Sequence, residues 1–427
     1  MNPKDLLIQG GRVIDPAQNI DDVMDILLSC GRVAALGKEL FRRNAETFDA
    51  HGLIVMPGLI DLHTHLREPG AEEAETIASG CAAALWGGFT AVCPMPNTEP
   101  PADDSGRIHF ILERARGCAT RVYPVGAITR GRRGEELAEM GDMARAGAVA
   151  FSDDGNSVAN AQIMVNALRY ARMVGKPLIL HEEDRTLCLE GQMNESALSE
   201  QLGLKGMPRT AEDIMVMRDI ALAEYTGAPL HITHISTRGA VEIIRAAKAR
   251  HVKVTCDVTP HHLTLTEDLV ASFDTRYKIN PPLRTRDDIA ALRTGLAEGV
   301  IDAIATDHAP HYPENKEVEF TYAAFGVTGL ETALAVIDRE LVRPGFLTWG
   351  DVARKMSFSP SRILGVEGGS LEVGAIADVT LYNPEAPWKV DPKHMKSRSS
   401  NTAFFDWELP GRAAAIVVGG ALHKNQE

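Results

Sequence analysis

Two histidines one residue apart carry the first sign of chemistry in this chain. The largely apolar run Leu53–Leu62 leads directly to His63 and His65, and Arg67 stands two residues further on. In a strand, residues i and i+2 point to the same face, roughly 7 Å apart, so both imidazoles can converge on one metal ion. The planar fork of arginine suits a carboxylate beside that metal. The pattern predicts a metal site that also binds an anion.

Further ligands have to come from other strands, and the middle of the chain repeats a strand–helix rhythm. Short apolar runs alternate there with helical stretches, which is typical of βα units and a parallel sheet. The eight predicted strands are Leu59–His65, Thr90–Met95, Val122–Ile128, Ala148–Ser152, Pro177–His181, Leu230–His234, Lys253–Val258 and Ile301–Thr306. Eight such units predict an α/β fold of the (β/α)8 TIM-like barrel type. A doubly wound open sheet is disfavoured, because no Gly-x-Gly-x-x-Gly turn follows the first strand.

The carboxyl ends of barrel strands carry the chemistry of such folds. Metal-ligand residue types occur at five of these ends: His63 with His65, Asp153 with Asp154, His181, His234, and Asp307. Core packing does not explain so many, because buried charges need partners. Nitrogen and oxygen donors without thiolates indicate a zinc-like ion, and six ligands predict a two-metal centre with a bridging carboxylate. From spacing alone, either Asp153 or Asp154 could be that bridge.

Both ends of the chain have a β-rich pattern. Leu6–Ile14, with a central glycine pair, predicts a hairpin, and Asp25–Leu28 with Arg32–Leu36 predicts another strand pair. Asp378–Tyr382 and Ala415–Val418 have the same character near the other end. We therefore expect residues 1–55 plus 368–427 to form a small composite β-sandwich domain beside a catalytic barrel of residues 56–367.

Composition narrows the class of protein. Hydrophobic residues make up 44% and charged residues 24% of the chain, as in ordinary soluble globular proteins. The net charge of −14 argues against nucleic-acid and anionic-membrane partners, although local arginines could still bind an acidic substrate. The six cysteines form no Cys-x-x-Cys pair, which favours free thiols in a reducing compartment. With no signal-peptide pattern and no membrane-length apolar run, the sequence predicts a cytoplasmic protein.

Four stretches resemble one enzyme family closely. They are His63–Gly70 (HTHLREPG), Met95–Thr98 (MPNT), Phe151–Gly155 (FSDDG) and Ala305–His311 (ATDHAPH). Over nearly its whole length the chain resembles the bacterial long-chain dihydroorotases of the amidohydrolase superfamily. The His-x-His motif is shared across that superfamily, whereas the arginine and Asp-Asp-Gly motifs are specific. The resemblance implies reversible cyclisation of N-carbamoyl-L-aspartate to L-dihydroorotate plus water, in pyrimidine (UMP) biosynthesis.

The resemblance also implies roles for individual residues. Two zinc ions per subunit would be bridged by Asp154 and a hydroxide, and Asp307 would serve as general base and then acid. The implied metal ligands are His63, His65 and Asp307 for one ion, His181 and His234 for the other, and Asp154 for both. The implied substrate contacts are Arg67, Asn97, Asn280, His311 and the backbone at Phe325 and Gly326.

Some of these residues have simpler interpretations. Arg67 could pair with Glu68 or Glu72 at the surface, and Asn97 and Asn280, each beside proline, could merely shape turns. His261, His262 and His308 are expected to support the site rather than bind metal, and His231 is expected to pack away from it. The charged segment 312–322 is expected to be a mobile loop near the site.

Other functions remain open at this stage. A hydantoinase, dihydropyrimidinase or allantoinase is the nearest alternative, but these enzymes typically bridge their metals with a carboxylated lysine, where this chain has Asp153 and Asp154. A non-catalytic, dihydroorotase-like partner of aspartate transcarbamoylase would be expected to have lost ligands. For the enzyme, we expect a small-molecule substrate, a homodimer, and scope for an aspartate transcarbamoylase partner.

Overall fold

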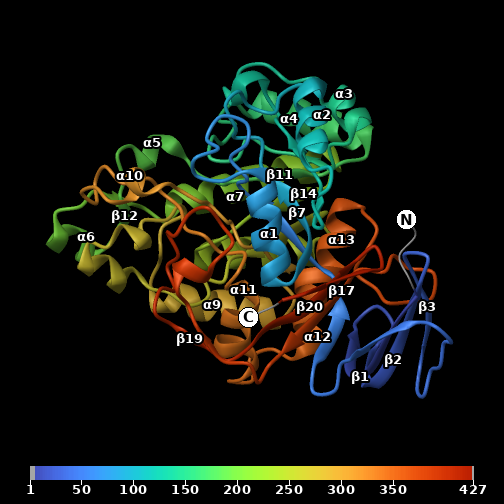
Figure 1. The fold of residues 1–427 in the computed structure, drawn as a ribbon. Helices are drawn as coiled ribbons and strands as arrows, with labels where there is room; N and C mark the ends of the chain where they lie inside the picture. Colours follow the sequence, from blue (N-terminus) through green and yellow to red (C-terminus); the bar gives the residue numbers. More distant parts are fainter. Residues whose placement is uncertain (1–4, 426–427) are drawn as a thin grey trace.

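The computed structural model describes residues 5–425 and contains a strand in each of the eight predicted runs (Figure 1). These strands are β6 (Leu59–Thr64), β7 (Phe89–Pro94), β8 (Arg121–Val122) with β9 (Val125–Gly126), β10 (Ala150–Phe151), β11 (Leu178–Leu180), β14 (Leu230–Ile232), β15 (Val254–Val258) and β16 (Ala303–Ile304). The third run is split into β8 and β9 at Pro124, whose nitrogen cannot donate to a neighbouring strand.

The strands pair in parallel in chain order, which confirms the predicted barrel class. One set runs β6-β7-β8 and the other β9-β10-β11-β14-β15-β16. Where the first and last strands meet, Thr64 and His308 form a parallel bridge, and the His65 amide donates to the His308 carbonyl at 2.8 Å. The buried Asp61 carboxylate accepts the Thr306 amide at 2.9 Å across the same junction. This junction brings the ends of the first and eighth strands together.

Helices follow the strands and cover the sheet. They are α1 (Ile77–Gly87), α2 (Ser105–Arg114), α3 (Met140–Ala146), α4 (Ala161–Val174), α7 (Thr210–Thr226), α8 (Arg238–Ala249), α9 (Arg286–Ala297), α11 (Ala333–Ile337), α12 (Trp349–Ala353) and α13 (Ser359–Leu364), with the short α5 (Arg185–Cys188), α6 (Ala197–Leu202) and α10 (Pro313–Lys316) among the loops. In α4, Met164, Leu168 and Ala171 repeat at helical spacing and are fully buried, so apolar periodicity places this helix on the sheet. Asn160 caps its first turn by accepting amide hydrogen bonds.

Strands from both ends of the chain share one sheet, which we call the terminal sheet. Its members are β1 (Leu6–Asp15), β2 (Ile20–Ser29), β3 (Arg32–Gly37), β4 (Glu46–Asp49), β5 (Ile54–Pro57), β17 (Val379–Asn383), β20 (Arg412–Val418) and β21 (Ala421–Lys424). The blue strands β1 to β3 and the red strands β17 and β20 lie beside the barrel in Figure 1. The terminal sheet has its own apolar core, and the domain boundaries given above stay a prediction.

The predicted hairpin within Leu6–Ile14 is wrong. These residues form one strand, β1, which pairs antiparallel with β2 along its length. The glycine pair makes a bulge instead of a turn, because the register shifts between Ile8 and Gly11 and Gly10 has a φ of 69°. A Cβ on Gly10 would also lie 2.3 Å from the His51 ring, so the close packing there requires glycine.

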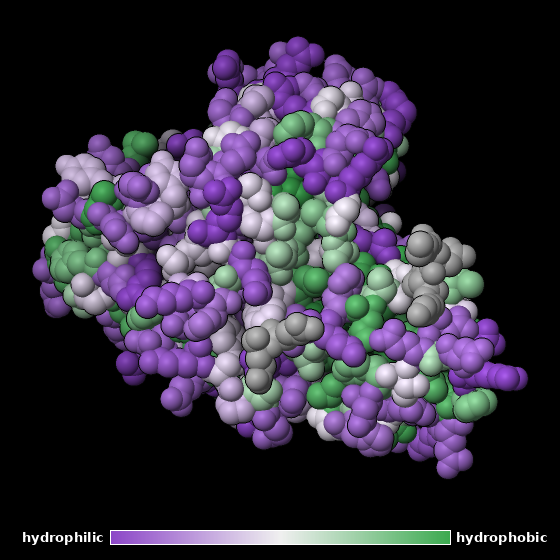
Figure 2. Space-filling view, viewed as in Figure 1, coloured by the Kyte–Doolittle hydropathy of each residue, from purple (hydrophilic) through white to green (hydrophobic). Residues whose placement is uncertain are grey.

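The surface agrees with the composition. Figure 2 shows a face covered mainly by hydrophilic side chains, with hydrophobic residues exposed in smaller groups. None of the helices within residues 5–425 has both the length and the apolar character needed to cross a membrane.

One buried carboxylate joins the barrel to the terminal sheet, and its removal is expected to destabilise the protein. Asp378, 6% exposed, accepts from Arg121 of β8 at 2.9 and 3.2 Å and from the Gly419 amide at 2.6 Å. We expect Asp378→Ala to lower the free energy of unfolding by about 2–4 kcal/mol, because it leaves these donors unpaired. Urea denaturation at pH 7 measures the change. The control Glu113→Ala, which breaks the exposed pair with Arg116, should cost about 0.5 kcal/mol or less; equal losses in the two variants would contradict the expectation.

Candidate metal centre

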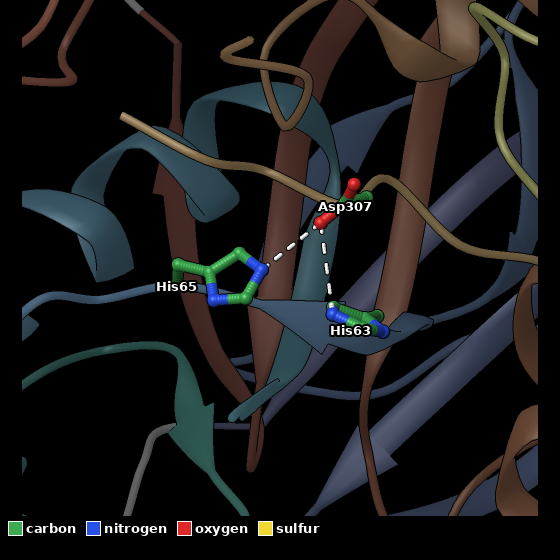
Figure 3. A group of neighbouring side chains, drawn as sticks. All are labelled: His63, His65 and Asp307. Carbon is green, nitrogen blue, oxygen red and sulfur yellow. Dashed lines mark hydrogen bonds and ion pairs between the residues drawn. The ribbon is translucent and has the colours of Figure 1, made fainter. Parts of the chain in front are cut away.

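His63, His65 and Asp307 meet where the first and eighth strands end (Figure 3). The Asp307 Oδ1 lies 3.0 Å from His65 Nε2 and 3.6 Å from His63 Nε2, and Figure 3 shows its second oxygen pointing away from both rings. All three side chains are buried, with exposures of 6% or less. The strand geometry thus aims two imidazoles and one carboxylate at a common point.

Asp154 lies at the centre of the larger cluster. Its Oδ1 is 3.4 Å from His63 Nε2, 3.6 Å from His234 Nε2 and 3.8 Å from His181 Nδ1. Its Oδ2 is 3.7 Å from His65 Nε2. A single carboxylate therefore faces all four predicted histidines, as a bridging ligand would.

Asp153 points elsewhere and is occupied by other bonds. Its Oδ1 accepts the amides of Ile128 and Thr129 at 2.9 and 3.1 Å, and its Oδ2 accepts the Thr129 hydroxyl. Successive residues at a strand end face opposite ways, so only one of the two aspartates can reach the cluster. The structure places Asp154 there and uses Asp153 to join the ends of neighbouring strands.

Opposite charges in the cluster stabilise each other's ionised forms. Burial opposes ionisation of Asp154, but the charge of His63 and hydrogen bonding from His234 outweigh it and hold the carboxyl pKa well below its usual value. Burial likewise disfavours the charged form of His63, yet the opposite charge of Asp154 raises its pKa to about 9. Two ionised carboxylates here thus require nearby positive charge.

The donor set fits a divalent metal. Ligand atoms of His63, His65 and Asp307, and of His63, Asp154 and His234, lie within 4.8 Å of one another in each group. The buried Nε2 of His63 has no hydrogen-bond partner in the described chain, as expected of a nitrogen that serves a metal. Imidazoles and carboxylates without thiolates are typical ligands of zinc and similar ions.

A second layer of contacts orients the histidines, and the sequence did not reveal it. His63 Nδ1 lies 2.8 Å from the Thr233 hydroxyl, which donates to Asp257 at 3.1 Å. Asp257 also accepts the His234 amide at 2.7 Å and contacts His231 Nε2 at 2.8 Å. His231 lies outside the cluster, as expected, but it anchors Asp257 as well as packing. The one available signal was a charged residue inside the apolar strand β15.

Backbone conformation at three of these positions is unusual. Arg67, His234 and Asp307 have φ values of 60°, 37° and 48°, in the left-handed region that residues other than glycine rarely adopt. Such conformations persist where surrounding contacts hold them and are common at functional sites. They place the side chains of strand-end residues where a regular strand would not.

Arg67 and His311 form a polar wall next to the metal cluster. Arg67 donates through Nε to the Pro310 carbonyl at 3.0 Å, and its terminal nitrogen lies 3.3 Å from His311 Nε2. Glu68 pairs with Arg114 and Glu72 accepts the Gly70 amide, so the alternative surface salt bridge of Arg67 is not formed with either. The guanidinium therefore has donors left for an anion.

Asn97 belongs to the same side of the cluster. Its Oδ1 is 2.9 Å from His65 Nδ1, and its Nδ2 donates to Asp154 at 3.4 Å. A residue that only shaped a turn would not contact two members of the cluster. Asn97 thus orients His65 and lies within reach of whatever binds there.

Asn280 and Phe325 are linked to the site through Glu183 and His311. Asn280 donates to Glu183 at 2.8 Å, and Glu183 lies 3.5 Å from His181 Nε2. The buried Asn280 Oδ1 has no partner within the described residues. His311 Nε2 contacts the Phe325 carbonyl at 2.7 Å. Glu183 was missed by the sequence reasoning, although it follows the histidine of the fifth strand.

The remaining histidines near the cluster make their contacts away from it. His262 bonds to Thr259 and to the Pro281 carbonyl, both at 2.8 Å, and His308 lies 3.2 Å from Glu75. His261 is buried and packs against the His262 ring, with no hydrogen bond to its Nε2 in the described chain.

Comparison with known structures agrees on the fold. An L-hydantoinase (dihydropyrimidinase) from Arthrobacter aurescens superposes with a TM-score of 0.89 at 24% identity, covering 98% of this chain and 96% of that one. A dihydropyrimidinase from Brevibacillus agri gives 0.84 at 22% identity, covering 98% and 94%.

Sequence comparison identifies the family. Residues 52–240 match the family model described as dihydro-orotase-like. A protein named dihydroorotase from Syntrophotalea carbinolica is 51% identical over 418 residues, 98% of each chain, and one from Pelotomaculum thermopropionicum is 52% identical over 417 residues, again 98% of each. With such identity over nearly the full length, the chain belongs to the dihydroorotase family.

Proposed function

We propose that the protein is a dihydroorotase, which interconverts N-carbamoyl-L-aspartate with L-dihydroorotate and water in pyrimidine (UMP) biosynthesis. The observation that carries the proposal is the position of Arg67: a guanidinium with free donors beside a buried His/Asp cluster. Dihydroorotate bears both a cyclic amide for the cluster and a free carboxylate for the arginine. The names of the family's curated members support the same activity.

Two zinc ions are the proposed cofactors. His63, His65 and Asp307 would hold one, His181 and His234 the other, and Asp154 would reach both, because it already faces all four histidines. Ions bound there supply Lewis acidity toward the ring carbonyl and the attacking water.

The side chains of the chain would bind the substrate and move the proton. Arg67 and Asn97 would bind the carboxylate, while Asn280, His311 and the backbone at Phe325 and Gly326 would contact the ring. In hydrolysis, Asp307 would accept the proton of the attacking water as its oxygen bonds to the ring carbonyl carbon, and return it to the ring nitrogen as the amide C–N bond breaks. Ring closure reverses these steps, with protonated Asp307 assisting the loss of water.

The alternatives fit the site less well. Hydantoinase-like enzymes share the fold, but their typical carboxylated lysine has no counterpart in this cluster, where Asp154 occupies the central position. A purely scaffolding role gives no reason for six buried residues of metal-ligand type in one place. A homodimer and an aspartate transcarbamoylase partner remain predictions, to be tested by light scattering and co-purification. The cytoplasmic location predicted from the sequence is to be tested by fractionation.

The carboxylate contact predicts substrate selectivity. The zinc-loaded protein should act on dihydroorotate and much less on dihydrouracil, the same ring without the carboxylate. Arg67→Ala should raise KM for dihydroorotate roughly 10- to 100-fold, because a charge-assisted hydrogen bond is lost, and should erode the preference for it. The control Arg114→Ala removes a guanidinium that pairs with Glu68 instead, and should leave KM unchanged. No turnover of dihydroorotate by the zinc-loaded protein would overturn the proposed function.

The role of Asp307 predicts a separation of metal binding from turnover. Asp307→Asn should keep most of the bound metal, because the other ligands remain, yet lower kcat about a thousandfold through loss of the proton acceptor. Metal content per chain and steady-state kinetics measure both effects, and the wild type should hold two ions. Asp302→Asn, at the other end of the same strand, is the control. Near-normal kcat in Asp307→Asn would refute the role, and one ion per active chain would refute the two-metal centre.

The contact between Thr233 and His63 predicts an effect on metal affinity. Thr233→Val keeps the side-chain shape but removes the hydroxyl that orients the His63 ring, so zinc affinity should fall about 10- to 100-fold. Competition with a chelator measures the affinity. Thr255→Val is the matched control, because the Thr255 hydroxyl contacts His231 and not His63. Equal zinc affinities for the two variants would contradict a role of Thr233 in orienting His63.

A further inference from the structure

Two buried lysines lie beside the proposed substrate contacts. Lys278 is 2% exposed and Lys316 is 5% exposed, and neither forms an ion pair within residues 5–425. A buried ammonium group is costly unless hydrogen bonds replace its hydration. Burial lowers the pKa of Lys278 to about 8, and burial together with the nearby charge of Lys278 lowers the pKa of Lys316 to about 7.

Within residues 5–425, both ammonium groups donate their hydrogen bonds to backbone carbonyls. Lys316 Nζ donates to the carbonyls of Ala324 at 2.8 Å, Gly326 at 3.0 Å and Lys278 at 3.4 Å. These acceptors use all three of its hydrogens.

Lys278 binds the earlier part of the same segment. Its Nζ donates to the carbonyls of Phe320 and Thr321 at 2.8 and 2.9 Å, and it lies 4.7 Å from the centre of the Phe325 ring. Four of the carbonyls bound by the two lysines belong to segment 320–326, which lies outside the strands and helices, so side-chain donors take the place of a regular backbone ladder there. The Gly326 carbonyl also accepts from Asn401 Nδ2 at 3.1 Å.

The segments joined in this way carry the substrate contacts. The acceptors of Lys316 flank Phe325 on both sides, and Lys278 is two residues from Asn280. The Gly326 amide donates to the Lys278 carbonyl at 2.9 Å, so backbone and side chains link the same two segments. His311, which contacts Arg67, is tied to this unit through the Phe325 carbonyl.

We propose that Lys278 and Lys316 are positioning residues for substrate binding, which lock segments 278–280 and 320–326 into one wall of the site. The inference rests on the proposed function, because it concerns the ring-binding wall of the same site. Neither lysine touches the metal-ligand cluster, so the two side chains act through the backbone they hold. Within the charged segment 312–322, which the sequence predicts to be a mobile loop, residues 317–319 are exposed. Buried Lys316 holds one end of this exposed part, and Lys278 holds the other end through the Phe320 carbonyl.

Replacing each lysine by methionine keeps the length of the side chain and removes its donors. For Lys316→Met and Lys278→Met we expect amide hydrogen exchange in a peptide covering 320–327 to accelerate about tenfold or more, because local opening no longer breaks those bonds. KM for dihydroorotate at pH 6.5 should rise about tenfold, with kcat within about threefold and metal content unchanged.

Lys355 supplies a matched control. It is also a 5% exposed lysine that donates to a backbone carbonyl, that of Ile301 at 2.8 Å, but it lies near the start of the eighth strand, away from Asp307. Lys355→Met should destabilise the fold without changing exchange at 320–327 or KM. If Lys316→Met does not fold, Lys316→Gln, which keeps an amide donor, is measured in its place.

The outcomes separate the two proposals. Unchanged exchange at 320–327 in both lysine variants, or the same change in Lys355→Met, would overturn the positioning role whatever the substrate is. Faster exchange with unchanged KM would overturn the link to substrate binding. Failure of the wild type to act on dihydroorotate would sink the proposed function alone, since the exchange experiment still decides whether the lysines hold this wall.

Discussion

The site depends on how the protein keeps two carboxylates ionised where water hardly reaches. Asp154 and Asp307 are 4% and 5% exposed, and burial alone would drive both toward the neutral form. Four imidazoles around Asp154 reverse that tendency. The same electrostatic demand suits the cluster to a divalent cation, whose charge can compensate both carboxylates. The barrel contributes by bringing five strand ends to one place.

That geometry needs help from outside the cluster. His63 can offer Nε2 to a metal because Nδ1 is held by Thr233, and Thr233 is held in turn by Asp257. Asp257 also fixes the backbone at His234, whose left-handed φ would otherwise be costly. Asp61 performs a similar task between the first and eighth strands. Two buried acids in barrel strands, Asp61 and Asp257, thus fix the strand ends around the cluster without belonging to it.

Much of this could be predicted from sequence, for a physical reason. Strand-end residues such as His63, His181 and Asp307 are recognisable because a strand alternates faces and a barrel gathers its carboxyl ends. What failed depended on contacts between distant segments. Spacing could not separate Asp153 from Asp154, since the choice follows from bonds to Thr129. The glycine pair in β1 suits a turn or a bulge equally well, and pairing with β2 decided between them.

The fold alone does not determine which ring the site accepts. An L-hydantoinase and a dihydropyrimidinase share this architecture at 24% and 22% identity. Under the proposed function, selectivity would come from parts that are not barrel strands: Arg67 after the first strand, and the wall formed by Asn280, His311 and Phe325. Irregular segments hold a shape only if their carbonyls and amides find partners. Burying Lys278 and Lys316 beneath that wall costs free energy. Under the proposed function, this cost has a reason: substrate specificity would depend on the position of backbone that no strand or helix supports.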